Sequence, residues 1–244
     1  MKDSDTRDGR MDAKDNRGKT ANHNGKFAAV RVLMFDLDGT LIDSRLDLAH
    51  SVNATLRHMG RPELPHEAIY KLVGSGAAIL VQRALGQGAS EEESQRGLEY
   101  FLSYYREHML DNTVTYPGVR EGLELLNDRP MALLTNKPVK FSQAILQGLG
   151  LARYFQVVYG GNSFGTKKPD PEGACAVLRD FRASPAEAML VGDSEVDVRT
   201  ARNAGIWSCG VSYGLGPQGF RAHPPDLLLD SLTELPERLD HVSD

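Results

Sequence analysis

Six short, nearly continuous apolar runs recur along this chain, and segments of helical pattern separate most of them. The runs cover residues 30–35, 131–134, 155–158, 188–191, 206–211 and 226–229. A run without apolar–polar alternation is typical of a strand that is covered on both faces, as in a parallel sheet between helices. The sequence therefore predicts an α/β fold with a doubly wound, Rossmann-like core of parallel strands.

Proline and glycine mark where the helices between these strands begin and end. Pro138 is expected at the first position of one helix, and Gly150 lies just beyond the end of that helix. Asp170 and Pro171 precede the next helical segment. These signals follow the second and third predicted strands, which agrees with a strand–helix–strand repeat.

The interval between Asp43 and Tyr116 breaks this rhythm, because we find only helical pattern in it. Apolar residues at helical spacing stop at Gly60, which is expected to end the first of these helices. Ser90 and Glu93 have the spacing of a capping box at the start of a later one. We therefore predict an all-helical insertion of about 70 residues after the first strand.

The chain is expected to have three parts. Residues 1–27 have almost no large apolar side chains, so they are predicted to form a flexible tail. Residues 28–45 and 116–244 are predicted to form the α/β catalytic core, and residues 46–115 a helical cap domain. A cap inserted at this point is expected to act as a lid over a site at the edge of the sheet.

Composition excludes several classes of protein. The net charge of −5 is unfavourable for a nucleic-acid binder, and no apolar stretch approaches the roughly 20 residues that cross a bilayer. Two cysteines among 244 residues are too few for a disulfide scaffold or a four-cysteine zinc site. No apolar run of the kind that a secretory signal needs precedes Phe27. We therefore expect a cytoplasmic enzyme that binds neither nucleic acid nor a membrane.

Two acidic residues follow the first predicted strand. Asp36 and Asp38 alternate in an extended segment, so their side chains can face one site. Ligands of open parallel sheets bind at the carboxyl ends of the strands, which is where this segment falls. Paired carboxylates repel each other unless a cation lies between them, and Gly39 permits the backbone to approach an anion closely. The alternative is a surface Asp-Gly turn.

A second acidic pair follows the run at residues 188–191. Asp193 lies at the end of that predicted strand, and Asp197 falls in the first turn of the next helix. At that position Asp197 could also serve only to stabilise the helix N-terminus. Oxygen ligands without cysteine or paired histidines favour Mg²⁺ over zinc or copper. The sequence therefore predicts a magnesium site.

Groups that suit a phosphate complete the predicted site. Thr135 and Asn136 end the second predicted strand just before a helix, where a hydroxyl and backbone N–H groups can bind an anion. Lys168 precedes another helix and can reach the same crevice. Each of these features is common by itself, and together they predict a phosphate site.

These four segments, in this order, resemble the motifs of the haloacid dehalogenase superfamily, in its branch of phosphatases with a helical cap. The resemblance spans residues 30–239. The matching motifs are Asp36-Leu37-Asp38-Gly39-Thr40, Thr135-Asn136, Lys168-Pro169-Asp170-Pro171, and Gly192-Asp193-Ser194 with Asp197. Within the superfamily, residues 73–76, 116–119 and 212–214 are most similar to phosphoglycolate phosphatases.

The resemblance implies a role for each acidic residue. Asp36 would be the nucleophile that forms an aspartyl-phosphate, and Asp38 the general acid and base. Mg²⁺ would be held by Asp36, by the backbone carbonyl of Asp38 and by Asp193. Asp197 would not bind the metal directly, but would orient Lys168 or a metal-bound water. The family's activity implies hydrolysis of a small organic phosphate, most simply 2-phosphoglycolate, by a monomer or homodimer.

The resemblance also implies which residues bind the substrate. Lys168 and Thr135 would hold the phosphoryl oxygens. The cap segment at residues 73–76 would face the phosphate, and a carboxylate on the substrate would meet Lys71 or Arg83. The residues expected to contact substrate are Gly39, Thr135, Asn136, Gly74, Ser75 and Gly76.

Other functions remain open at this point. A sugar phosphate or pyrophosphate could be the substrate, and the same core could act as a phosphomutase. A dehalogenase is disfavoured because that branch lacks the acid found here as Asp38, and a non-catalytic phosphate sensor because Asp36 and Asp38 are both intact. The G-x-G-x-x-G pattern at residues 214–219 precedes no helical pattern, so it does not predict a dinucleotide site.

Overall fold

The structure, a computed structural model, describes residues 25–240. Most of the predicted flexible tail, residues 1–24, therefore lies outside the described residues. Phe27, at the end of that predicted tail, is only 2% exposed and packs edge-on against Trp207 at a ring distance of 5.2 Å. Phe27 therefore belongs to the packed core, although the predicted core begins only at residue 28.

Six parallel strands form one sheet, in the spatial order β5-β4-β1-β6-β7-β8. They are β1 (Val32–Phe35), β4 (Met131–Leu134), β5 (Val157–Tyr159), β6 (Ala188–Gly192), β7 (Trp207–Val211) and β8 (Leu227–Leu229). Each falls on one of the predicted runs, with ends shifted by two residues at most. The strand order reverses between β1 and β6, as it does in a doubly wound Rossmann-like sheet, so the predicted fold class is confirmed.

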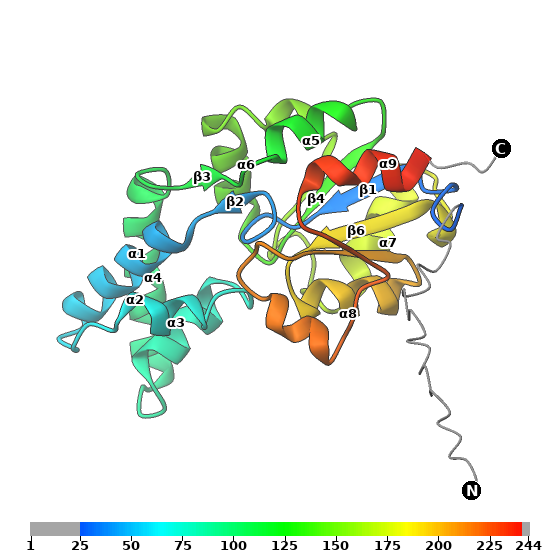
Figure 1. The fold of residues 1–244 in the computed structure, drawn as a ribbon. Helices are drawn as coiled ribbons and strands as arrows, with labels where there is room; N and C mark the ends of the chain where they lie inside the picture. The colour runs from blue at the N-terminus through cyan, green and yellow to red at the C-terminus, as the bar shows by residue number, and fades with distance from the viewer. Residues whose placement is uncertain (1–24, 241–244) are drawn as a thin grey trace, which may run out of the picture.

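Helices cover both faces of this sheet (Figure 1). One face packs on α7 (Glu172–Asp180) and α8 (Glu195–Ala204), and the other on α5 (Val119–Leu125), α6 (Val139–Gly148) and α9 (Leu235–Asp240). Along β1, Val32 and Met34 pack on the face covered by α7 and α8, whereas Leu33 and Phe35 pack on the opposite face. This division is the period of two expected of a strand. It explains why the strand sequences are apolar throughout.

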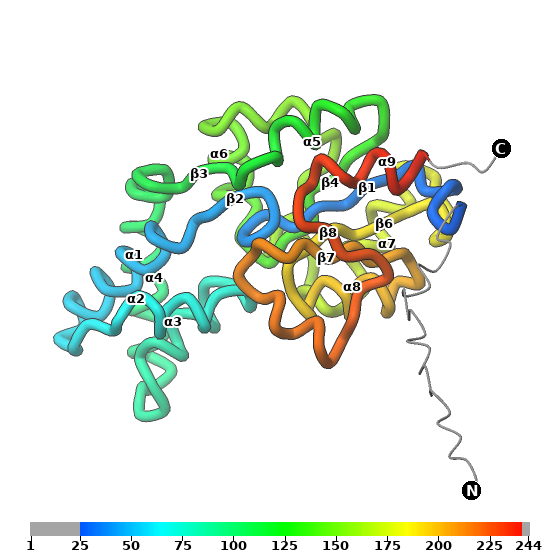
Figure 2. Tube along the Cα trace, viewed as in Figure 1, coloured from blue at the N-terminus to red at the C-terminus, as the bar shows by residue number. Residues whose placement is uncertain are grey.

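The helical insertion consists of four helices beside the carboxyl ends of the strands (Figure 2). They are α1 (Arg45–His58), α2 (His66–Tyr70), α3 (Ala77–Leu85) and α4 (Glu91–His108). The predicted capping box is present at the start of α4. The Glu93 backbone N–H donates to Ser90 Oγ at 3.1 Å, and the Ser90 N–H donates to the Glu93 carboxylate at 2.9 Å. Gly60 has a φ of +66° just beyond α1, as expected for a residue that ends a helix.

Two short strands were not predicted. β2 (Ile42–Asp43) and β3 (Val114–Thr115) pair antiparallel where the insertion leaves and rejoins the core. The prediction of helices alone between Asp43 and Tyr116 is therefore wrong at β3. Two residues are too few to give a strand pattern, and Val114 is 56% exposed, so no apolar run marks β3. A smaller difference concerns Pro138, which has an extended ψ of 138° and caps α6 instead of occupying its first position.

A buried aspartate fastens the two connections together. Asp47, on the first turn of α1, is 1% exposed. Its carboxylate accepts hydrogen bonds from the backbone N–H groups of Asn112 and Thr113, at 3.0 and 2.8 Å, and from the Thr113 hydroxyl at 2.7 Å. The start of the insertion is thereby joined to the segment that leads out of it.

Four short 3₁₀ helices complete the secondary structure of residues 25–240. They are η1 (Ala152–Tyr154), η2 (Pro185–Glu187), η3 (Pro217–Arg221) and η4 (Leu232–Glu234). Within residues 25–240, none of the helices combines the length and the apolar character needed to cross a bilayer.

Candidate active site

The predicted acidic residues meet where the strand order reverses. Asp36 follows β1 and Asp193 follows β6, and these two strands are neighbours in the sheet. The Asp36 N–H donates to the carbonyl of Val191 at 2.9 Å, so the ladder continues to the first acid of the site. Crevices at such a reversal are the usual ligand sites of doubly wound sheets. The sheet thus brings together residues that are 157 positions apart in the sequence.

Three carboxylates form a compact cluster at this crevice. One oxygen from each of Asp36, Asp193 and Asp197 lies within 4.8 Å of the others. Burial raises the pKa of Asp36 to about 6, against the attraction of Lys168. Burial, together with repulsion from Asp197 and Asp36, raises the pKa of Asp193 to about 8. The carboxylates therefore repel one another, and a bound cation would reduce this repulsion.

Lys168 balances part of this charge. Its Nζ atom lies 2.9 Å from Asp36 Oδ1 and 2.6 Å from Asp197 Oδ1, and the side chain is almost completely buried. Burial alone lowers the pKa of a lysine, but the attraction of Asp197 and Asp36 outweighs it and the pKa of Lys168 is raised. Asp197 also accepts a 2.7 Å hydrogen bond from the Ser194 hydroxyl at the start of α8. It therefore both caps that helix and holds Lys168.

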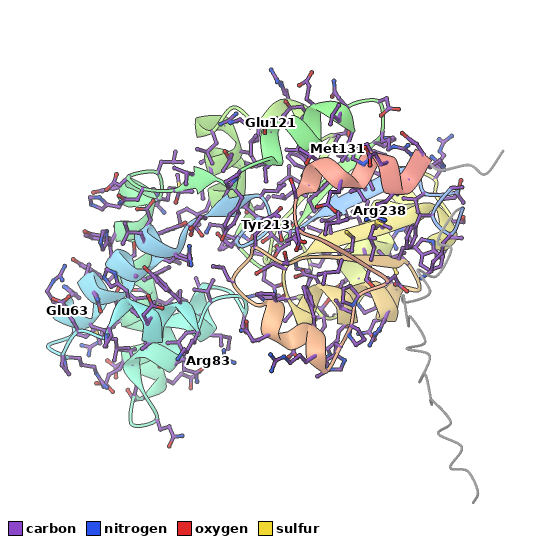
Figure 3. All side chains as sticks on the ribbon, viewed as in Figure 1. Glu63, Arg83, Glu121, Met131, Tyr213 and Arg238 are labelled. Atoms are coloured by element: carbon purple, nitrogen blue, oxygen red, sulfur yellow. The ribbon has the colours of Figure 1, made fainter. Side chains whose placement is uncertain are left out.

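A glycine-containing loop fixes the position of Asp193. The backbone N–H groups of Leu215 and Gly216 donate to Asp193 Oδ2 at 2.6 and 3.0 Å. A Cβ atom on Gly39 or on Gly214 would overlap the Asp193 side chain. Gly214, the first glycine of the G-x-G-x-x-G stretch, is thus explained by close packing against Asp193. Tyr213, just before this loop, donates to the Thr40 carbonyl at 3.0 Å and lies on the side of the core that faces the insertion (Figure 3).

Asp38 has two side-chain partners, Lys137 and Ser44, and neither was predicted from the sequence. Lys137 Nζ lies 2.9 and 3.1 Å from the two Asp38 carboxylate oxygens, and the Ser44 hydroxyl donates to Oδ1 at 2.5 Å. Lys137 is buried, and the charge of Asp38 raises its pKa although burial opposes this. The only sequence signal was its place directly after Thr135 and Asn136, which does not distinguish it from a surface lysine at the start of a helix.

Asn136 connects the core to the insertion. Its side-chain amide N–H₂ donates to the carbonyls of Lys168 and Gly74, at 3.1 and 3.2 Å, and its Oδ1 atom accepts from the Lys168 N–H at 2.9 Å. The Asn136 side chain is therefore occupied by protein partners. The Thr135 hydroxyl, in contrast, accepts only a long 3.3 Å bond, from the Lys137 N–H, among the described residues.

A cavity lies between the acidic residues and the insertion. Of the predicted site residues, Asp36, Asp38, Thr135, Asn136, Asp193, Gly74 and Gly76 line it. Gly39, Ser75, Lys168 and Asp197 are not part of its lining. Lys71 lines the cavity with an exposed side chain, whereas Arg83 is exposed on α3 away from it (Figure 3). Apolar side chains of the insertion, among them Val73 and Phe101, form its opposite wall.

The carboxylate cluster has the chemistry of a site for a hard divalent cation. Its donors are all oxygen atoms; Asp193 and Asp197 are buried, and Asp36 is partly buried. Asp36 Oδ1 is buried and accepts no hydrogen bond of normal geometry from the residues described. A divalent ion would relieve the repulsion that raises the pKa of Asp193, and oxygen ligands of this kind suit Mg²⁺. The residues present therefore fit the predicted ion.

Comparison with known proteins identifies the family to which this chain is similar. Residues 33–211 match the sequence model of haloacid dehalogenase-like hydrolases. A phosphoglycolate phosphatase of Vibrio parahaemolyticus is 38% identical over 217 residues, which cover 85% of this chain and 95% of that protein. A phosphoglycolate phosphatase of Pseudomonas savastanoi is 39% identical over 214 residues, covering 84% of this chain and 78% of the relative.

A solved structure is similar over nearly the same length. The crystal structure of a predicted phosphoglycolate phosphatase from Haemophilus somnus superposes with a TM-score of 0.81 at 31% sequence identity. The match covers 86% of this chain and 97% of the other. The similarity therefore includes both the sheet and the helical insertion.

Proposed function

This chain belongs to the haloacid dehalogenase-like hydrolases and is a phosphoric monoester hydrolase, and we propose that its substrate is 2-phosphoglycolate, which it converts to glycolate and phosphate. The observation that carries the proposal is the group of Asp36, Asp193 and Lys168 at the edge of a cavity that Asp38 also lines. The names of the similar proteins support the choice of substrate.

The first step of the proposed reaction is attack by Asp36. A carboxylate oxygen of Asp36 forms a bond to phosphorus while the bond from phosphorus to the ester oxygen breaks. Asp38 donates a proton to the leaving oxygen, so that glycolate departs without an alkoxide charge. The product of this step is an aspartyl-phosphate on Asp36. Lys168, 2.9 Å from Asp36, balances negative charge around the phosphoryl group, and the free hydroxyl of Thr135 binds one of its oxygens.

The second step is hydrolysis of the aspartyl-phosphate. Asp38 takes a proton from a water molecule, whose oxygen attacks phosphorus as the bond to Asp36 breaks. Asp38 can serve in both steps because Lys137 and Ser44 hold its carboxylate in one place. Asp197 orients Lys168 through their 2.6 Å contact.

Mg²⁺ would be held by the carboxylates of Asp36 and Asp193 and the backbone carbonyl of Asp38. When bound, the ion supplies positive charge that reduces the repulsion between the phosphate and the carboxylate of the nucleophile. The loop at residues 214–216 would hold Asp193 in position for the ion through its two backbone N–H donors.

Residues 46–115 are proposed to act as a cap domain on a core formed by residues 28–45 and 116–244. Gly74 and Gly76 line the cavity from the cap side, and the Gly74 carbonyl accepts from Asn136. A cap in this position would exclude water from the phosphoryl group during the first step. The cytoplasmic location and the monomeric or homodimeric state stay predictions.

The proposal is tested with purified protein, Mg²⁺ and a panel of phosphomonoesters that includes 2-phosphoglycolate, sugar phosphates and pyrophosphate. We expect release of inorganic phosphate, with the highest kcat/KM for 2-phosphoglycolate, and no activity when EDTA is present. Formation of a phosphate isomer in place of free phosphate would identify a mutase instead. Inactivity on every monoester would reject the proposal.

The variant Asp36→Asn tests the nucleophile. Turnover is expected to fall by at least about 1,000-fold, because the amide cannot form the acyl phosphate. Mass spectrometry of the quenched wild-type protein is expected to show one added phosphoryl group on the peptide that contains Asp36, and none in the variant. Unchanged turnover in a folded variant would remove Asp36 from the mechanism.

A further inference from the structure

A buried hydroxyl on the insertion has no hydrogen-bond partner of normal geometry within residues 25–240. Tyr105, on α4, is 2% exposed, and its Oη atom makes no hydrogen bond to any of the described residues. Buried polar atoms are normally paired, and each unpaired one costs free energy, so an exception in a cavity wall indicates a ligand. Tyr105 lines the cavity between the insertion and the acidic residues. Stacking on Phe101 and edge-on contact with Phe141 hold its ring in place.

The cation beside this hydroxyl also faces the cavity. Lys137 Nζ lies 4.7 Å from the centre of the Tyr105 ring, and Lys137 lines the same cavity. Its ammonium group has three N–H donors; it pairs with both carboxylate oxygens of Asp38 and lies against the Tyr105 hydroxyl. Burial raises the pKa of Tyr105 to about 12, so its hydroxyl is a donor at neutral pH. The cavity wall therefore offers a buried cation and a free neutral donor next to each other.

Their position relative to Asp38 indicates which part of a substrate they would meet. In the proposed reaction, Asp38 contacts the ester oxygen that leaves. Lys137 Nζ is 2.9 Å from Asp38, and Lys137 is paired with Asp38 whereas Lys168 is paired with Asp36 and Asp197. A substituent that is one or two bonds away from the leaving oxygen would therefore lie against Lys137 and Tyr105.

We propose that Lys137 and Tyr105 form a carboxylate-binding subsite, which recognises an acid group one methylene away from the leaving oxygen. The inference rests on the proposed phosphatase function and specifies the substrate class as short phosphorylated hydroxy acids. An N⁺–H and an O–H donor would pair with the two carboxylate oxygens, and low exposure strengthens both interactions.

This subsite replaces the cap cations expected from the sequence. Arg83 is exposed and does not line the cavity, and Lys71 lines it with an exposed side chain. Water competes for an exposed ammonium group, so a contact there discriminates weakly between substrates. Lys137 comes from the core and Tyr105 from the insertion, which means that the subsite is complete only when both parts are in contact.

The test compares 2-phosphoglycolate with ethyl phosphate, which has the same two-carbon ester but no carboxylate. The readout is the ratio of the two kcat/KM values. In Tyr105→Phe this ratio is expected to fall about tenfold, the usual loss for one hydrogen bond to a charged group. Tyr104→Phe is the matched control, because Tyr104 stacks on His108 and is not part of the cavity lining. Its ratio is expected to stay at the wild-type value.

Lys137→Met and product inhibition give two further readouts. Loss of Lys137 is expected to slow both esters, because Asp38 loses a partner, and to lower the ratio by more than Tyr105→Phe does. The inhibition constant of glycolate is expected to rise about tenfold in Tyr105→Phe, while that of inorganic phosphate stays constant. Thermal unfolding verifies that each variant is folded.

The outcomes separate the subsite from the function on which it rests. Equal losses for both esters in Tyr105→Phe and Lys137→Met, or no loss in either variant, would overturn the subsite while the phosphatase activity stands. A wild-type enzyme that hydrolyses ethyl phosphate as well as 2-phosphoglycolate would do the same. A wild-type enzyme that hydrolyses neither ester nor any other monoester would overturn both.

Discussion

Asp193 shows how the charge of a single buried residue can lower the stability of the folded protein. Its carboxylate is 3% exposed and lies within 4.8 Å of two other carboxylates. These neighbours and burial raise its pKa to about 8 from the ordinary value of 3.8. Between pH 3.8 and about 8, Asp193 is ionised in the unfolded chain but still protonated in the folded, metal-free protein. The free energy of unfolding of the metal-free protein therefore decreases as the pH rises between these two values.

The variant Asp193→Asn isolates this effect. Asparagine keeps an oxygen that can accept from Leu215 and Gly216, but it has no charge. In EDTA we expect the variant to equal the wild type in thermal stability at about pH 4, and to exceed it by more than about 3 °C at about pH 8.5. Thermal unfolding across this pH range measures the difference. A difference that is constant with pH would contradict the raised pKa of Asp193.

At the scale of elements, the connections between sheet and insertion depend on a few buried contacts. The Asp47 carboxylate collects N–H and O–H groups from residues 112–113 on the other connection. The loop after β7 places backbone N–H groups on Asp193 and leaves no room for a side chain at Gly214. Both arrangements link segments that are far apart in the sequence, so a change in either should affect folding and site geometry together.

Asp47→Ala would leave the buried backbone N–H and the buried hydroxyl of Thr113 without their acceptor. We expect it to lower the free energy of unfolding by about 2–6 kcal/mol, at about 1–3 kcal/mol for each of the two unpaired groups. Urea denaturation measures the loss. Asp111→Ala is the matched control, since Asp111 is an exposed residue whose side chain pairs with the exposed His108, and it should change the free energy by less than about 0.5 kcal/mol. Equal effects of the two substitutions would show that Asp47 does not join the connections.

Gly214→Ala would force a methyl group against the Asp193 side chain and the Gly39 carbonyl. The loop has to shift, so Asp193 moves with it, and we expect kcat/KM to fall by at least about tenfold. Gly88→Ala serves as control, because a Cβ atom there meets no other atom within 4 Å and its φ is not positive. Steady-state phosphate release compares them. A fully active Gly214→Ala enzyme would mean that the loop does not determine the position of Asp193.

At the scale of the whole molecule, the acidic site depends on contacts from every part of the fold. Its ligand-type oxygens come from the ends of β1 and β6 and from α8, and Val73, Gly74 and Gly76 of the insertion line the same cavity. A cation bound there would connect segments that the chain joins only through long intervals. Binding to the folded state alone stabilises the folded state as a whole.

We therefore expect Mg²⁺ to stabilise the wild-type protein and not Asp193→Asn. At about 100 times its dissociation constant the ion adds about 2.7 kcal/mol to the free energy of unfolding. For a chain of this size that corresponds to a rise in Tm of about 5–10 °C. Thermal unfolding with increasing Mg²⁺ at about pH 7.5 measures it. A similar rise in Asp193→Asn, or none in the wild type, would place the cation elsewhere.

The strands and the site acids could be predicted from the sequence because each leaves a local mark. A buried parallel strand needs an unbroken apolar run, and all six runs proved to be strands. Asp36, Asp38 and Asp193 follow such runs directly, and the carboxyl ends of parallel strands meet at one edge. β3 has two residues and an exposed Val114, so it leaves no comparable mark.

Only the tertiary structure decided which side chains meet across the cavity. The pairing of Lys137 with Asp38, the unpaired hydroxyl of Tyr105 and the position of Arg83 away from the cavity depend on how the helices of the insertion pack against the core. A lysine or tyrosine in a helix has the same sequence pattern whether it faces solvent, a core or a ligand. The sequence determines the fold class and the acids at the strand ends because these follow from hydrophobic burial and strand direction. The partners of a side chain follow from long-range packing, which no local pattern encodes.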